Sequence, residues 1–126
     1  MSHHTFAGNA WEFPARLADD GVVDGDTVDI VCDVGFDMRR TIRVRVFGVD
    51  TAEIHTVGED TEEFQRGQEH KAFVEQWFMF ESQGSEYPLS VTTLKETGKF
   101  GRYVAVIHGP EGESLTSALV EEFDDV

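Results

Sequence analysis

The sequence has few of the features that identify a secreted or membrane protein. It contains a single cysteine, Cys32, so no disulfide can form within the chain. It has no apolar run of about 18 residues, the length that a membrane-spanning helix needs. Residues 1–5 lack the basic start and the apolar middle of a signal peptide. We therefore expect a cytoplasmic protein without a membrane partner, although processing of the N-terminus would allow a secreted form.

Positive charge is also scarce. Lysine and arginine total 10 against 25 aspartates and glutamates, which gives a formal net charge of −15. Proteins that bind nucleic acid usually carry a basic face, so this balance has two interpretations. Either the protein does not bind nucleic acid, or it works in molar salt, where the Debye length is about 3 Å and an acidic surface no longer repels DNA. We favour the second, halophilic interpretation because the local motifs described below are stronger evidence than the global charge.

The length and the apolar pattern predict one folded domain. A chain of 126 residues that is 40% hydrophobic can bury a modest core. We expect residues 1–10 to form a flexible leader and 11–126 to form the domain, with β-strands followed by one main helix, more strands and a short C-terminal helix. This order is typical of a mainly β, α+β fold, a five-stranded barrel of the OB type. The predicted strands are 11–17, 26–32, 39–49, 88–94 and 103–108, and the predicted helices are 62–80 and 114–123.

Two predicted strands have acidic residues at their ends. The motifs are V-D-G-D-T-V at 23–28 and R-V-F-G-V-D-T-A-E at 45–53. By the two-residue period of a strand, Asp26 and Asp50 each extend the row of side chains that faces the core. We therefore expect the two carboxylates to converge at one end of the barrel. Carboxylate oxygens suit a hard cation such as Ca²⁺.

Two arginines are candidates for binding a phosphate group near these acids. Arg45 opens the second motif, and Arg102 lies in K-F-G-R-Y at 99–103. A guanidinium group pairs with phosphate oxygens at two points and keeps its proton, so acids, cation and arginines together indicate phosphodiester chemistry. Arg45 and Asp50 have opposite parity in a regular strand, and a bend at Gly48 could bring them to the same side.

The three motifs together resemble the staphylococcal nuclease (thermonuclease-like) family. The family pattern reads V-x-D-G-D-T-V, then R-x-x-x-V-D-T-P-E, then a Y-G-R turn, and the resemblance covers residues 13 to 120. It implies an OB-type barrel and a Ca²⁺-dependent nuclease that acts on DNA or RNA and leaves 3′-phosphate ends. It also implies a further C-terminal helix, which this sequence lacks.

The resemblance also implies a metal site. Asp26 and Asp50 correspond to the side-chain ligands of Ca²⁺, and Thr51 corresponds to a ligand through its backbone carbonyl. Asp24 corresponds to an acid that lies behind these ligands.

The remaining implied roles concern the substrate and the reaction. Glu53 corresponds to the general base, or to the group that positions the attacking water. Arg45 and Arg102 correspond to the residues that hold the phosphate as charge develops. Lys99 and Phe100 lie where the family contacts the terminal phosphate and the nucleotide.

Several departures and alternatives accompany this assignment. Ala52 replaces the usual proline, Phe100 replaces a tyrosine, and Gly98 stands where an acid often begins the turn. D-G-D is also a common hairpin turn, so the acids and arginines could be ordinary surface residues. The alternative functions are a catalytically inactive OB-fold module that binds nucleic acid or protein, and a fragment that needs a partner chain. We expect a monomer or a weak homodimer. The homodimer is considered because the helix 62–80 carries a wide apolar stripe, part of which a second copy of the chain would cover.

Overall fold

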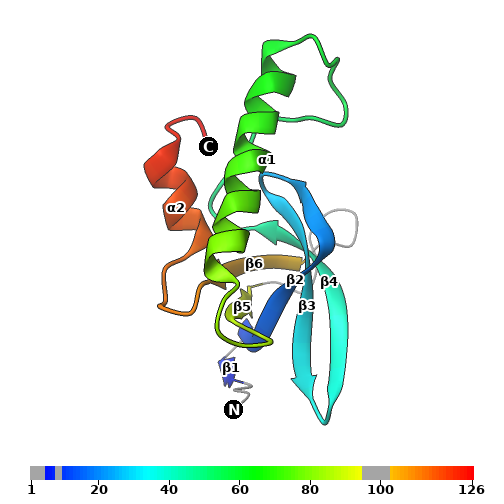
Figure 1. The fold of residues 1–126 in the computed structure, drawn as a ribbon, viewed down its shortest axis with the longest axis vertical. Helices are drawn as coiled ribbons and strands as arrows, with labels where there is room; N and C mark the ends of the chain where they lie inside the picture. Colours follow the sequence, from blue (N-terminus) through cyan, green and yellow to red (C-terminus); the bar gives the residue numbers. More distant parts are fainter. Residues whose placement is uncertain (1–4, 8–9, 95–102) are drawn as a thin grey trace.

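The protein is described by a computed structural model that covers residues 5–7, 10–94 and 103–126 (Figure 1). The strands and helices follow one another in a single chain order. The strands are β1 (Thr5–Ala7), β2 (Ala10–Asp24), β3 (Thr27–Gly35), β4 (Met38–Val46), β5 (Leu89–Thr93) and β6 (Tyr103–His108), and the helices are α1 (Glu62–Glu81) and α2 (Leu115–Glu122).

Five of the strands form a closed barrel, which confirms the predicted OB-type α+β class. The order is β2-β3-β4-β6-β5, and a further pairing of β5 with β2 closes the sheet. The β4–β6 pairing is parallel and the other pairings are antiparallel. The short strand β1 lies within the expected leader and pairs with the start of β2.

Strand β2 is longer than the sequence predicted. The prediction that it ends at Leu17 is wrong, because the pairing with β3 continues to Asp24 through two register shifts that mark β-bulges. Asp20 has a positive φ of 51°. A Cβ atom at Gly21 would lie 2.7 Å from the carbonyl oxygens of Ala18 and Asp29. The residues 18–21 therefore bend a continuous strand instead of ending it.

The barrel core consists of β-branched and aliphatic side chains at alternate strand positions. Cys32 belongs to it, with 2% exposure, which confirms that it is a core residue. Burial raises the pKa of the Cys32 thiol to about 11. Helix α2 adds Leu115, Ala118 and Leu119 to the same core. The largest fully buried barrel and helix side chains include Val28, Ile30, Val44, Val91, Ile107, Leu115, Leu119, Val74 and Phe78.

Helix α1 lies across the barrel and beside α2 (Figure 1). Its N-cap is Thr61, whose hydroxyl accepts the Phe64 N–H at 3.1 Å. Val74 and Phe78 are buried, whereas Phe80 points away from the core. Neither described helix is long and apolar enough to cross a membrane.

Candidate functional site

The segment after β4 turns back sharply and brings Arg45 to the predicted acids. Gly48 has a φ of +90°, a conformation that favours glycine. One guanidinium nitrogen of Arg45, Nη1, donates to the carbonyl oxygens of Val46 at 2.9 Å and Val49 at 2.7 Å. The other, Nη2, lies 3.5 Å from Asp50 Oδ1. The predicted bend at Gly48 is therefore confirmed, and it places Arg45 beside Asp50.

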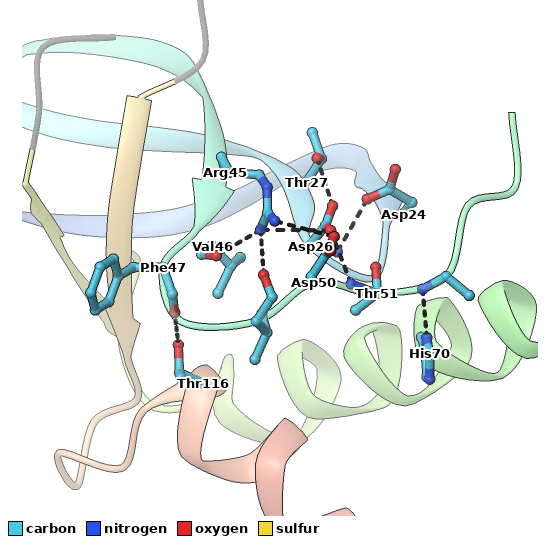
Figure 2. Close-up of polar contacts among 12 residues, drawn as sticks. Asp24, Asp26, Thr27, Arg45, Val46, Phe47, Asp50, Thr51, His70 and Thr116 are labelled. Atoms are coloured by element: carbon cyan, nitrogen blue, oxygen red, sulfur yellow. Dashed lines mark hydrogen bonds and ion pairs between the residues drawn. The ribbon is translucent and has the colours of Figure 1, made fainter. Parts of the chain in front are cut away.

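Asp26 lies in the turn immediately before β3, close to Arg45 (Figure 2). Its Oδ1 accepts from the Thr27 hydroxyl at 3.1 Å, and its Oδ2 accepts from the Thr51 N–H at 3.1 Å. Arg45 Nη1 lies 3.6 Å from the same Oδ2. Asp26 is 8% exposed, so this nearly buried carboxylate is held by donors from three different segments.

Asp24 and Asp26 form a coupled pair of carboxyl groups. Asp24 Oδ1 accepts the backbone N–H of Asp26 at 3.1 Å. Burial, together with the neighbouring Asp26 carboxylate, raises the pKa of Asp24 to about 6. Burial alone would also raise the pKa of Asp26, but the hydrogen bond from Asp24 and the charge of Arg45 hold it below its usual value. Negative charge is therefore concentrated on Asp26.

Gly25 and Thr51 pack directly against each other. A Cβ atom at Gly25 would lie 2.7 Å from the Thr51 side chain, and Gly25 does not have a positive φ. The glycine of the D-G-D motif is therefore needed for close approach. The Thr51 hydroxyl oxygen is buried and has no hydrogen-bond partner among the described residues. Such an oxygen next to a carboxylate is suited to a ligand or a water molecule.

Glu53 and Asp50 are less constrained than Asp26. The Asp50 side chain is 90% exposed. Glu53 accepts the backbone N–H of His55 at 3.4 Å, within its own loop. Within the described ranges, no hydrogen bond or ion pair joins Glu53 to Asp26, Asp50 or Arg45. The predicted base thus lies on the site loop but is not bonded to the site residues that the structure describes.

The structure brings part of the predicted set together. Arg45 lies within ion-pair distance of both Asp26 and Asp50, and Thr51 lies against Asp26. In the parts of the chain that are described, no three His, Cys, Asp or Glu side chains gather closely enough to form a metal site by themselves. A hard cation here would thus depend on the Thr51 oxygens and on water as well as carboxylates. The other predicted residues lie outside the described residues: Lys99, Phe100 and Arg102.

Sequence reasoning missed one residue that contacts the site loop. His70 on α1 is fully buried, and its Nδ1 accepts the backbone N–H of Ala52 at 3.0 Å (Figure 2). A Cβ atom at Gly67, one turn earlier, would lie 2.8 Å from the Ala52 carbonyl oxygen. A glycine and a histidine three residues apart share one helix face, and this spacing was the available signal.

A scan against protein-family models and a search of curated proteins both give no match. The function is therefore argued from the motifs and from the geometry around Asp26.

Proposed function

We propose that this protein is a Ca²⁺-dependent nuclease of the staphylococcal nuclease type, which hydrolyses phosphodiester bonds of DNA or RNA in a high-salt setting. The observation that carries the proposal is the position of the Arg45 guanidinium, 3.6 Å from Asp26 and 3.5 Å from Asp50. A fixed cationic group beside two acids at the mouth of an OB-type barrel suits a phosphate group with a bound cation. The oligomeric state, monomer or weak homodimer, stays a prediction.

The donor set fits a hard cation. Asp26 and Asp50 would hold it, and Thr51 has a buried hydroxyl without a partner among the described residues, next to a carbonyl that can also bind metal. A carboxylate has about four lone-pair sites, so Asp26 keeps acceptor capacity beyond its existing donors. When bound, Ca²⁺ would neutralise charge on the phosphodiester, which is a poor electrophile until that happens.

Arg45 is oriented for a phosphate oxygen before any substrate arrives. The carbonyl oxygens of Val46 and Val49 fix its Nη1. Its contact with Asp50 is long, and the Asp50 side chain is 90% exposed, so this ion pair is weak. Arg45 can therefore exchange the Asp50 carboxylate for a phosphate oxygen at little cost. Arg102 would supply the second guanidinium group in this proposal.

Glu53 is the proposed general base. Its hydrogen bond to the His55 N–H is long, at 3.4 Å, so the carboxylate is free to turn toward a water molecule beside the phosphate. In the reaction, Glu53 would take the proton of the attacking water as the new P–O bond forms. The bond to the leaving oxygen of the nucleotide then breaks.

One observation favours the second candidate, an inactive OB-fold binding module. Glu53 is bonded within its own loop, and no described contact directs it toward Asp26. A module of this kind would bind nucleic acid or protein without cleaving it. Cleavage and binding assays on the same preparation distinguish the two functions.

The proposal is tested by plasmid cleavage in Ca²⁺ or EDTA, across a KCl series that reaches molar concentrations. We expect cleavage in Ca²⁺, none in EDTA, and a loss of cleavage in Asp26→Asn. The matched control is Asp29→Asn, since Asp29 lies nearby on β3 and pairs with Arg43 on the outer surface. Equal activity in Asp26→Asn and Asp29→Asn would contradict the metal assignment, and binding without cleavage would favour the inactive module.

The high-salt setting has a separate test. A net charge of −15 on 126 residues destabilises the compact state through self-repulsion, and salt screens that repulsion. We expect the midpoint of thermal unfolding to rise from low to molar KCl. An unchanged or lower midpoint in high KCl would contradict the halophilic interpretation.

A further inference from the structure

The loop that carries the candidate site has little regular structure, yet two of its consecutive backbone N–H groups are bound by side chains. The Thr51 N–H donates to Asp26 Oδ2 at 3.1 Å, and the Ala52 N–H donates to His70 Nδ1 at 3.0 Å. The first acceptor lies in the turn before β3, and the second lies on α1. The backbone between Asp50 and Glu53 is therefore fixed from two segments that are distant in sequence.

The hydrogen bond with Ala52 determines which ring nitrogen of His70 carries the proton. A nitrogen that accepts a backbone N–H carries no proton, so the ring proton of neutral His70 lies on Nε2. Nε2 lies 3.2 Å from Asp125 Oδ1, which can accept that proton. His70 is fully buried, and both of its ring nitrogens are thus satisfied by one backbone group and one carboxylate.

Asp125 is itself held by α1. Arg66 donates to both Asp125 oxygens, at 2.6 Å from Nε and 3.0 Å from Nη2. These hydrogen bonds lower the pKa of Asp125 to about 2, so the carboxylate is ionised near neutral pH. The Phe123 ring lies with its edge against His70, at 4.6 Å between centroids, and the Arg66 guanidinium lies 5.0 Å from the same ring. The segment after α2 thus covers this face of α1.

Close packing on α1 supports the same arrangement. The Ala52 and Glu53 carbonyl oxygens would lie 2.8 Å and 3.2 Å from a Cβ atom at Gly67. Only a residue without a side chain allows the loop this near to the helix. Glycine is a poorer helix former than alanine, and the close approach of the loop explains why glycine is found at position 67.

We propose that His70 is a positioning residue for the candidate site, and that the C-terminal segment acts on the site through Asp125. In this arrangement Asp125 fixes the ring of His70, His70 fixes the Ala52 amide, and the backbone on either side of Ala52 carries Thr51 and Glu53. The part of the inference that concerns cleavage rests on the proposed nuclease function. The part that concerns the loop conformation does not.

Two substitutions at His70 distinguish the role of Nδ1 from the role of Nε2. In His70→Asn the amide oxygen can occupy the place of Nδ1 and still accept from Ala52. In His70→Gln the longer side chain can reach the place of Nε2 and Asp125, but leaves the Ala52 N–H without its acceptor. We expect His70→Gln to lower kcat roughly 10- to 100-fold with little change in KM, a size typical of groups that orient a metal site, and His70→Asn to keep most of the activity. Equal losses in the two variants would overturn the proposal.

A second readout does not depend on nuclease activity. Hydrogen exchange of the Ala52 amide, followed by NMR in molar KCl, should be faster in His70→Gln and nearly unchanged in His70→Asn. If the parent protein cleaves nothing, this difference still supports the positioning role while the proposed function fails. Equal protection of Ala52 in the parent and in His70→Gln would overturn the positioning role whatever the activity.

The role of the Asp125 carboxylate is tested by substitution. Asp125 lies at the surface, so its replacement disturbs folding less than a change at the buried His70. Asp125→Ala removes the contact with His70, and Asp124→Ala makes the same change at the adjacent exposed residue. We expect Asp125→Ala to speed Ala52 exchange several-fold and Asp124→Ala to leave it unchanged. Equal effects of the two substitutions would show that the C-terminal segment does not act on the loop.

Discussion

The two halves of α1 differ in what they contact and in how their conformation is fixed. The N-terminal half contacts the site loop through Gly67 and His70, with defined hydrogen bonds and a backbone approach that a side chain would block. The C-terminal half packs Val74 and Phe78 into the barrel core and leaves an apolar groove of about 540 Å³ on its outer side. The groove is lined by Phe73, Gln76, Trp77, Met79, Phe80 and Gln83, none of which is charged.

The difference shows where each kind of substitution should act. Apolar burial is non-directional, so changes in the C-terminal half should alter stability through the area removed from water. Hydrogen bonds and charges are directional, so changes near the site loop should alter geometry and pH dependence. The comparison fails if substitutions at one end produce the effects expected at the other.

The largest effect is expected at Phe78. It is 1% exposed, whereas Phe80 on the same helix is 76% exposed, so the two phenylalanines are matched in chemistry and differ in burial. Phe78→Ala should lower the free energy of unfolding by about 3–5 kcal/mol, because it leaves a cavity in the core. Phe80→Ala should change it by less than about 0.5 kcal/mol, as is usual for surface sites. Denaturant unfolding in molar KCl measures both.

Ca²⁺ affinity is the control for this pair. Among the described residues, no hydrogen bond or ring contact joins either phenylalanine to residues 50–53, so under the proposed function both variants should bind Ca²⁺ like the parent at temperatures well below their unfolding midpoints. Similar losses of stability in the two variants would contradict the account of the C-terminal half of α1, in which Phe78 lies in the core and Phe80 is exposed.

A smaller effect is expected from Asp24, at the site end. Its pKa is about 6 in the folded protein and 3.8 in the unfolded chain, so the folded state takes up a proton as the pH falls through about 6. The ionised carboxylate therefore costs stability in full above about pH 6; the cost shrinks as the pH falls from about 6 to 3.8, and it is gone below 3.8, where the unfolded chain is protonated as well. Asp24→Asn should be roughly 1 kcal/mol more stable than the parent at pH 7 to 8, after allowance for its partial exposure.

This advantage should shrink as the pH falls below 6 and vanish below about pH 4, where Asp24 of the parent is protonated in both the folded and the unfolded state. Unfolding curves across this pH range measure the difference between the two proteins. Asp124→Asn makes the same change of charge at an exposed residue and should show no such pH dependence. A constant difference between Asp24→Asn and the parent from pH 5 to pH 8 would show that Asp24 is not coupled to Asp26 as described.

The barrel could be predicted from the sequence because its strands follow a simple pattern. Val28 and Ile30 alternate with polar residues, and the short turns between strands leave few ways to pair them. The prediction that Asp50 extends the core-facing row of β4 is wrong, because the strand ends at Val46 and the chain bends at Gly48, which leaves the Asp50 side chain 90% exposed. The bulged course of β2 could not be predicted, because Asp20 and Gly21 read as a turn until their pairing partners are known.

The hydrogen bond between His70 and the site loop could not be predicted from the sequence either. The helical pattern places His70 on the buried face of α1, but it does not say which backbone group lies opposite. That depends on how the loop after Gly48 crosses the helix, and on Asp125, which lies 55 residues away along the chain. Contacts between distant segments leave no local periodicity.

The substitution Glu53→Gln tests the central claim most directly, because it removes the proposed base while it leaves the metal ligands in place. At saturating Ca²⁺ in molar KCl, the account predicts a loss of cleavage rate of about 10²- to 10⁴-fold, the usual contribution of a general base. Ca²⁺ affinity, measured by titration on the same samples, should remain that of the parent. A Glu53→Gln protein that cleaves DNA as fast as the parent would contradict the account.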